Sequence, residues 1–164
     1  MILTKDVIKE CIRTKKIKIS PFSQANIGPA SVDLTLSDTF WVYEDVSSIV
    51  IREDVDFKRY TKRKRLKEIT LQPGEFVLGI TREKITLAPD ICGLLTGRSR
   101  FARMGILVHA TATFVQPGVS NHQVLEIKNV SHNALTLKPE LKIAQIVFLS
   151  TSGKAMYAGK FKQQ

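Results

Sequence analysis

The sequence predicts an all-β domain with one short helix at its N-terminus. After residue 16, short runs of β-branched and aromatic residues alternate with turn residues such as Pro73-Gly74, Pro89-Asp90 and Pro117-Gly118. Many short strands at close spacing favour a sandwich or a barrel. The length of 164 residues suits a single domain over residues 1–164 that is large enough to bury a core.

Residues 4–15 are the one long segment with a helical pattern. Four apolar residues recur there at helical spacing: Val7, Ile8, Cys11 and Ile12. Thr4 can cap the N-terminus, and Asp6 suits the positive end of the helix dipole. We therefore expect a helix that starts at Thr4 and ends near Lys15.

The remaining pattern predicts strands and one further short helix. The expected strands are Val32–Leu36, Phe40–Tyr43, Ser48–Arg52, Glu68–Leu71, Phe76–Ile80, Lys84–Leu87, Ile91–Leu95, Leu107–Ala110, Val124–Lys128, Ala134–Leu137 and Ile143–Phe148. A small helix is expected over Ser99–Met104, because Arg, Ala and Met favour helix and Gly105 can end it.

The positive charge of the chain is concentrated in one segment. The formal net charge is +10, and seven of the cationic residues lie between Lys58 and Lys67, so the rest of the chain carries only +3. Such a run is either a nucleic-acid patch or a solvated loop or hairpin arm. Only Tyr60 interleaves the cations as an aromatic residue, which favours the solvated arm. We expect no nucleic-acid partner.

Composition also argues against several classes of protein. Cys11 and Cys92 form no Cys-x-x-Cys pair and are expected to be reduced core thiols. The three histidines form no His-x-Glu partner to a Pro-Cys-x-x-Cys element, so a zinc-dependent base deaminase is not expected. The sequence has no apolar run of membrane-spanning length and no signal-peptide layout, which predicts a cytoplasmic protein without a membrane partner.

Three segments carry the chemistry. Gly97–Gly105 combines small residues, a hydroxyl and three guanidinium groups, which is the combination that a polyphosphate needs. The turn Gln116-Pro117-Gly118 follows it. Glu126 then stands in the apolar run Val124–Ile127, where a carboxylate is costly unless it has partners or a task.

These segments resemble the dCTP deaminase branch of the dUTPase-like superfamily. That branch carries Gly-Arg-Ser-Ser-Leu-Ala-Arg-x-Gly, then a Pro-Gly turn, then a Leu-Glu strand, in the order seen here. Four further segments also resemble the family: Pro29–Leu34, Leu71–Gly79, Ile143–Phe148 and Tyr157–Gln164. The resemblance is weakest at residues 42–68. It implies a distorted β-barrel or jelly-roll of the dUTPase-like type and a homotrimer with its active sites at subunit interfaces. It also implies a tail, residues 150–164, that covers the active site.

The resemblance also implies a role for each candidate residue. Glu126, Ser99 and Arg103 would be catalytic, with Glu126 as the proton shuttle, and burial would raise its pKa toward the working pH. The substrate-binding residues would be Arg98, Arg100, Thr111, Ala112, Gln116, Val124, Leu125, Tyr157, Lys160 and Gln164. Mg²⁺ would accompany the substrate triphosphate, and no metal would be needed at the base.

The sequence departs from the family pattern at the turn. Gln116 stands where the family usually has Asp, Val119 where it has an aromatic residue, and Asn121 where it has Gly. An amide can hydrogen-bond a sugar hydroxyl but cannot act as a general base. We therefore expect a dCTP deaminase that forms dUTP and ammonia. The alternatives are a dUTP diphosphatase, a bifunctional dUMP-forming dCTP deaminase, and a non-catalytic nucleotide- or nucleic-acid-binding homologue. Whether dUTP or dTTP also binds is left open.

Overall fold

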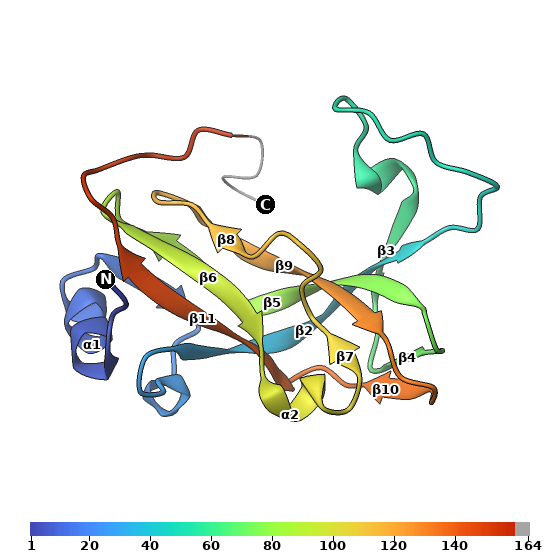
Figure 1. Ribbon diagram of the computed structural model, residues 1–164, viewed down its shortest axis with the longest axis horizontal. Helices are drawn as coiled ribbons and strands as arrows, with labels where there is room; N and C mark the ends of the chain where they lie inside the picture. Colours follow the sequence, from blue (N-terminus) through green and yellow to red (C-terminus); the bar gives the residue numbers. More distant parts are fainter. Residues whose placement is uncertain (160–164) are drawn as a thin grey trace.

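Strands dominate the structure, a computed structural model that describes residues 1–159. Nine strands form one curled antiparallel sheet, in which the main path runs β7-β9-β5-β2-β11-β6-β8, while β1 pairs with β5 and β3 with β2 (Figure 1). A separate two-stranded sheet pairs β10 with β4. The helix α1 (Lys5–Arg13) lies at one end of the curled sheet, beside the N-terminus. The predicted fold class, mostly β with a short N-terminal helix, is confirmed.

The elements have the following bounds. The strands are β1 (Ile17–Ser20), β2 (Val32–Tyr43), β3 (Thr61–Arg65), β4 (Ile69–Leu71), β5 (Phe76–Leu87), β6 (Ile91–Gly97), β7 (Ile106–Leu107), β8 (Phe114–Val115), β9 (Ser120–Asn129), β10 (Leu135–Leu137) and β11 (Lys142–Ser150). The short helices are η1 (Gln24–Asn26), η2 (Phe57–Arg59) and α2 (Ser99–Ala102).

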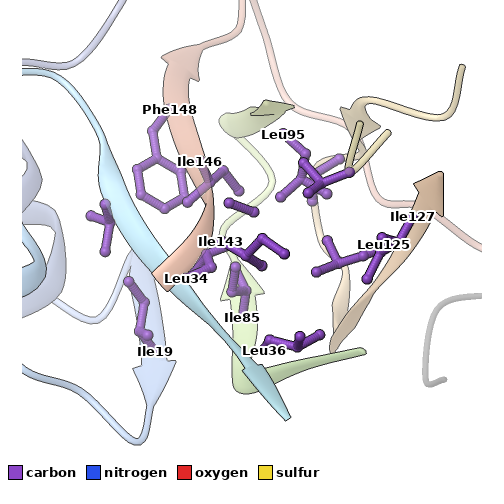
Figure 2. Close-up of a cluster of buried hydrophobic side chains, with 14 of the residues drawn as sticks. Ile19, Leu34, Leu36, Ile85, Leu95, Leu125, Ile127, Ile143, Ile146 and Phe148 are labelled. Carbon is purple, nitrogen blue, oxygen red and sulfur yellow. The ribbon is translucent and has the colours of Figure 1, made fainter. Parts of the chain in front are cut away.

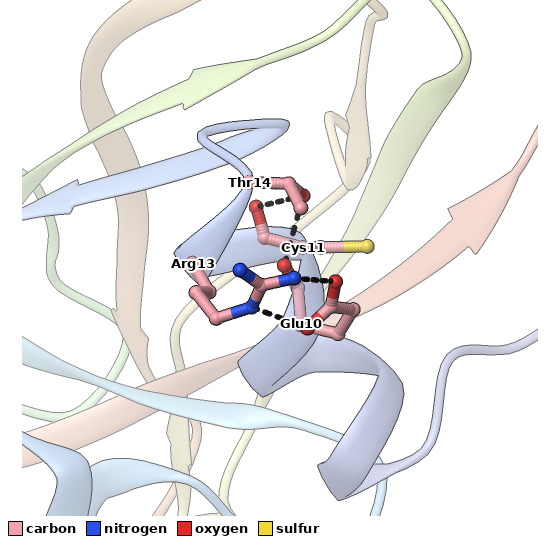
Figure 3. Close-up of polar contacts among 4 residues, drawn as sticks. All are labelled: Glu10, Cys11, Arg13 and Thr14. Carbon is pink, nitrogen blue, oxygen red and sulfur yellow. Dashed lines mark hydrogen bonds and ion pairs between the residues drawn. The ribbon is translucent and has the colours of Figure 1, made fainter.

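Helix α1 is shorter than its apolar pattern predicts. Thr4 occupies the N-cap position, but its side chain makes no capping hydrogen bond, so the predicted side-chain cap is wrong. The helix ends at Arg13, whose guanidinium donates to the Glu10 carboxylate at 2.6 and 2.8 Å (Figure 3). Thr14 caps this end by donating from its hydroxyl to the Glu10 carbonyl at 2.8 Å. Lys15 then turns into the left-handed region at a φ of 62°, which stops the helix.

Several predicted strands merge, and others are wrong or were missed. The strands β2 and β5 are each one long strand where two were expected. In each of them the pairing register shifts at the point where the prediction divided the strand, so the alternating sequence pattern is interrupted although the strand continues. Residues 48–52 form no strand, although Val50 and Ile51 favour one, because no neighbouring strand pairs with them and both stay exposed. Of the region predicted at 107–110, only Leu107 lies in a strand, the two-residue β7. The short strands β1 and β8 were not predicted.

The basic segment forms the unpredicted edge strand β3. Four cationic side chains stand exposed along it, and it pairs only with β2 among the described strands. Lys62 forms an ion pair with Glu44, and Arg65 pairs with Asp38 at 2.8 Å. Arg63 lies over the ring of Trp41, 5.6 Å from its centroid. Three of the four cations on β3 therefore have local partners, as a solvated arm would provide.

The core lies inside the curve of the sheet. Many of its fully buried members come from β2, β5, β9 and β11, among them Leu34, Leu36, Ile85, Leu125, Ile127, Ile143, Ile146 and Phe148 (Figure 2). Cys92 is buried and Cys11 half-buried, and both are free thiols, as predicted. Leu125 and Ile127 point into this core from β9, so the side chain of Glu126 between them must point to the opposite face.

Substitution of Phe148 tests this position of the core. It is fully buried on β11, so Phe148→Ala should lower the free energy of unfolding by about 3–5 kcal/mol through lost burial and a residual cavity. The exposed Phe22 is the matched control, and Phe22→Ala should change stability by only about 0.5 kcal/mol. Urea unfolding followed by circular dichroism measures both. Similar losses for the two variants would contradict this position of the core.

Candidate active site

A cavity of about 500 Å³ opens beside β9, and residues from both faces of that strand, Glu126 among them, line it. Its described lining residues are Tyr43, Phe57, Phe76, Leu78, Leu95, Ala112, Phe114, Val115, Gln116, Val119, Asn121, Gln123, Val124, Glu126 and Tyr157. Glu126 carries the one carboxylate in this set. Aromatic rings and three carboxamides make up much of the rest, which suits a small ligand with one flat apolar part and several hydroxyl or amide groups.

The Glu126 carboxylate is held by the loop that follows β7. Its Oε2 accepts the backbone N–H of Ala110 at 2.8 Å and that of Thr111 at 2.9 Å. Residues 108–113 therefore fold toward β9 and do not continue β7, which explains why the predicted strand at 107–110 is wrong. The loop fixes the carboxylate at the cavity wall.

These contacts also set the charge state of the site. Burial raises the pKa of Glu126, but the backbone N–H groups of Thr111, Ala110 and Ala112 lower it, and His109 lowers it further. The net direction is down, so the expectation that burial would raise this pKa is wrong. Glu126 is a carboxylate at neutral pH and can accept a proton directly.

His109 is a site residue that the sequence analysis did not single out. Both of its ring nitrogens are buried, and no described residue hydrogen-bonds them. Burial lowers the pKa of His109, while the nearby Glu126 charge partly opposes the shift. The imidazole is therefore neutral at pH 7. In the sequence it is a lone histidine between apolar residues, a pattern that carries no functional signal.

The segment Gly97–Gly105 with its three arginines, here called the arginine motif, lies outside the cavity of its own chain. Arg98 donates to the Lys142 carbonyl at 2.8 Å and forms an ion pair with Asp33 at 3.3 Å, which ties the start of α2 to β2 and β11. Ser99, Arg100 and Arg103 stand exposed on or beside α2. None of these four residues lines the cavity. The structure thus separates the predicted phosphate-type motif from the predicted proton shuttle.

The other predicted substrate-binding residues divide between cavity and core. Ala112, Gln116, Val124 and Tyr157 line the cavity, and Thr111 borders it through its bond to Glu126. Leu125 is fully buried in the core, so only its backbone could reach a ligand. Asn121 and Gln123 also line the cavity, although neither was a predicted site residue.

The C-terminal segment returns to the predicted sugar-binding turn. The N–H of Tyr157 donates to the Pro117 carbonyl at 2.9 Å. Met156 lies against Gly118, which has a φ of 76° and where an added Cβ would come within 2.6 Å of the Met156 sulfur. Two predicted tail contacts, Lys160 and Gln164, lie outside the described residues.

Residues 1–159 contain no group of three His, Cys, Asp or Glu side chains that could hold a metal ion. The described helices are all too short or too polar to cross a bilayer.

The sequence match now places the chain in a family. A model of dCTP deaminase-like proteins matches residues 2–151. The chain belongs to the dCTP deaminase family. It is 36% identical over 159 residues to a protein of Mycolicibacterium vanbaalenii named "dCTP deaminase, dUMP-forming", with 94% of this chain and 83% of the relative covered. A protein of Coprothermobacter proteolyticus with the same name is 38% identical over 152 residues, with 90% and 81% covered.

Solved structures share the fold of this dCTP deaminase family member. The 2'-deoxycytidine 5'-triphosphate deaminase of Agrobacterium tumefaciens superposes with a TM-score of 0.70 at 19% identity, and the match covers 90% of this chain. This chain spans about half of that one, 47% of its length. A dUTPase of phage phi11 of S. aureus superposes with a TM-score of 0.54 at 13% identity, with 88% of this chain and 96% of the dUTPase covered. The fold is therefore of the dUTPase-like type.

The low pKa of Glu126 can be measured directly. We expect the ¹³C signal of its side-chain carboxyl to titrate with a midpoint below about 4.3, the ordinary value for Glu, because backbone N–H donors stabilise the charged form. The stability that these bonds supply is full above the unfolded-state pKa and is lost as the pH falls through the folded-state value. Glu126→Gln identifies the resonance. A midpoint above about 4.3 would contradict the hydrogen-bonding described.

Proposed function

We propose that this chain deaminates dCTP and forms dUTP and ammonia. The observation that carries the proposal is Glu126, the one carboxylate among the described cavity residues, held in its charged form by the loop at residues 110–112. Membership of the dCTP deaminase family supports the same activity. The cavity volume of about 500 Å³ is in the range of small-molecule sites.

The chemistry requires one group that moves protons at the cytosine ring. Glu126 takes a proton from water as the water oxygen bonds to C4, and passes that proton to ring nitrogen N3. It then takes the second proton of the new hydroxyl group and transfers a proton to the amino group. The C4–N bond breaks, ammonia leaves, and C4 becomes the carbonyl carbon of uracil. Because Glu126 is already ionised, its first task needs no prior loss of a proton.

The arginine motif enters this scheme through a second subunit. Ser99 would orient the water and Arg103 would stabilise the developing charge, yet both stand exposed and away from the cavity of their own chain. We infer a homotrimer in which α2 of one subunit completes the cavity of its neighbour. Arg98 and Arg100, with the predicted tail contact Lys160, would bind the triphosphate, and Mg²⁺ would accompany it on the phosphate oxygens.

The remaining predicted contacts belong to the base and the sugar. The backbones of Thr111, Ala112, Val124 and Leu125 would read the base edge. Gln116 would meet the 3'-hydroxyl. Tyr157 and Gln164 belong to the tail, residues 150–164, that would close over the nucleotide.

A bifunctional, dUMP-forming deaminase is the second candidate. The names of the relatives from Mycolicibacterium vanbaalenii and Coprothermobacter proteolyticus favour it. The described cavity residues favour simple deamination, because Gln116 cannot deprotonate a water for attack on phosphorus. Pyrophosphate release separates the two candidates.

Two single variants and their mixture test the roles of Glu126 and Arg103. Glu126→Gln should fold normally and keep most of its nucleotide affinity, but release ammonia from dCTP roughly 10²- to 10⁴-fold more slowly, because the amide cannot shuttle protons. Arg103→Ala should also be slow. Unfolding and remixing the two inactive proteins should restore part of the activity, since some mixed trimers contain one intact site.

The Glu126 and Arg103 tests have clear contrary outcomes. Ammonia release by Glu126→Gln within about tenfold of the unaltered protein would remove Glu126 from the proton-transfer role. Failure of the mixed sample to regain activity, with trimers present by light scattering, would place both residues in the site of one subunit. Binding of nucleotide by the unaltered protein with no ammonia release would favour a non-catalytic homologue.

The product assay tests the role of Gln116. We expect ammonia from dCTP and little pyrophosphate from dUTP, because the amide at this position supplies no base. Gln116→Asp should gain dUTP hydrolysis, since general-base catalysis is worth about 10²- to 10⁴-fold in rate. Chromatography of the nucleotides after incubation with Mg²⁺ measures both reactions. Efficient pyrophosphate release by the unaltered protein would establish the dUMP-forming activity and assign the attack to another base.

A further inference from the structure

Three carboxamide side chains, Gln116, Asn121 and Gln123, line one cavity. We propose that this carboxamide cluster binds the two vicinal hydroxyls of a ribose, so that CTP is a substrate of the site beside dCTP. The inference rests on the proposed deaminase function, because it names a further substrate of the same cavity.

Two of these amides lie on the face of β9 that packs against the core, where apolar side chains are usual. Asn121 and Gln123 alternate along β9 on the same side as the core residues Leu125 and Ile127, and only 6% and 7% of their surfaces are exposed. A buried amide is costly unless it is hydrogen-bonded. An apolar residue at position 123 would continue the row at no such cost, so the two amides form a polar patch in an otherwise apolar part of the cavity wall.

The contacts of Gln123 hold it in place and leave part of its capacity for a ligand. Its Nε2 donates to the Asn121 Oδ1 at 2.6 Å, and its backbone N–H donates to the Thr81 hydroxyl at 2.9 Å. Among the described residues it makes no other side-chain hydrogen bond. A carboxamide has two N–H donors and an oxygen that accepts two bonds. One donor and the carbonyl oxygen of Gln123 therefore remain for a group in the cavity.

A ribose matches this cluster better than a deoxyribose does. Each hydroxyl both donates and accepts, and an amide does both as well, whereas a carboxylate only accepts. Gln116, exposed beside the Pro117-Gly118 turn, can serve the single ring hydroxyl of a deoxyribose. The remaining N–H and the carbonyl oxygen of Gln123 can then serve a second, adjacent hydroxyl. Val119 lines the same cavity with a small side chain, which leaves room for that oxygen.

The test compares CTP with dCTP on the intact protein in the presence of Mg²⁺. We expect kcat/KM for ammonia release from CTP to be within about tenfold of that from dCTP, since one hydrogen bond changes a binding constant by about that factor. Calorimetry with Glu126→Gln should give dissociation constants for the two nucleotides within the same factor. Discrimination against CTP by more than about tenfold, in turnover or in binding, would overturn the inference.

A near-isosteric variant tests whether the Gln123 amide binds the additional hydroxyl of CTP. Gln123→Met keeps the length of the side chain and removes its polar atoms, so CTP binding should weaken about tenfold while dCTP binding changes little. Gln72→Met, on an exposed turn, is the matched control and should alter neither. If Gln123→Met does not fold, Gln116→Leu must weaken the binding of both nucleotides. Equal losses of affinity for CTP and dCTP in Gln123→Met, or no loss of affinity in Gln116→Leu, would contradict the proposed role of the carboxamide cluster.

The outcomes separate this inference from the function on which it rests. Deamination of dCTP with rejection of CTP would leave the deaminase in place and overturn the ribose inference. Comparable binding of CTP and dCTP with no ammonia from either would support the sugar cluster and overturn the deaminase. Binding of neither nucleotide would overturn both.

Discussion

The site depends on the hydrogen bonds between the Glu126 carboxylate and the backbone N–H groups of Ala110 and Thr111. They connect a strand of the central sheet to a loop that has little regular structure of its own. Strand β9 is fixed by its register with β5, where Glu126 stands opposite Leu78. The carboxylate therefore holds the loop, and the loop in turn keeps the carboxylate charged.

Strand alternation explains how an ionised group can exist one residue from the core. Leu125 and Ile127 are fully buried, while Glu126 between them reaches the cavity. A shift of β9 by one residue would bury the charge and expose two core side chains, so the packing energy of the core also secures the geometry of the site. The same alternation brings Asn121 and Gln123 to the core side, where the cavity receives their amides.

The sequence predicted the fold well because the fold rests on local signals, and the same signals singled out Glu126, which the structure places at the wall of a cavity. The apolar run around Glu126 predicted both a strand and a carboxylate with a task, and β-branched runs predicted most of the sheet. The errors occur where tertiary contacts decide. Val50 and Ile51 favour a strand but have no pairing partner, whereas the charged β3 forms a strand because β2 offers it one. The lowered pKa of Glu126 and the burial of His109 depend on a loop whose path no local pattern encodes.

The charges of β3 also bear on how the molecule behaves in concentrated solution. An open sheet edge exposes unpaired N–H and C=O groups that invite edge-to-edge pairing with another copy, and a row of Lys and Arg side chains discourages that pairing by mutual repulsion. Added salt screens this repulsion, to a Debye length of about 3 Å at 1 M. The repulsion between the cations of β3 thus opposes aggregation through this edge, and it weakens as the ionic strength rises.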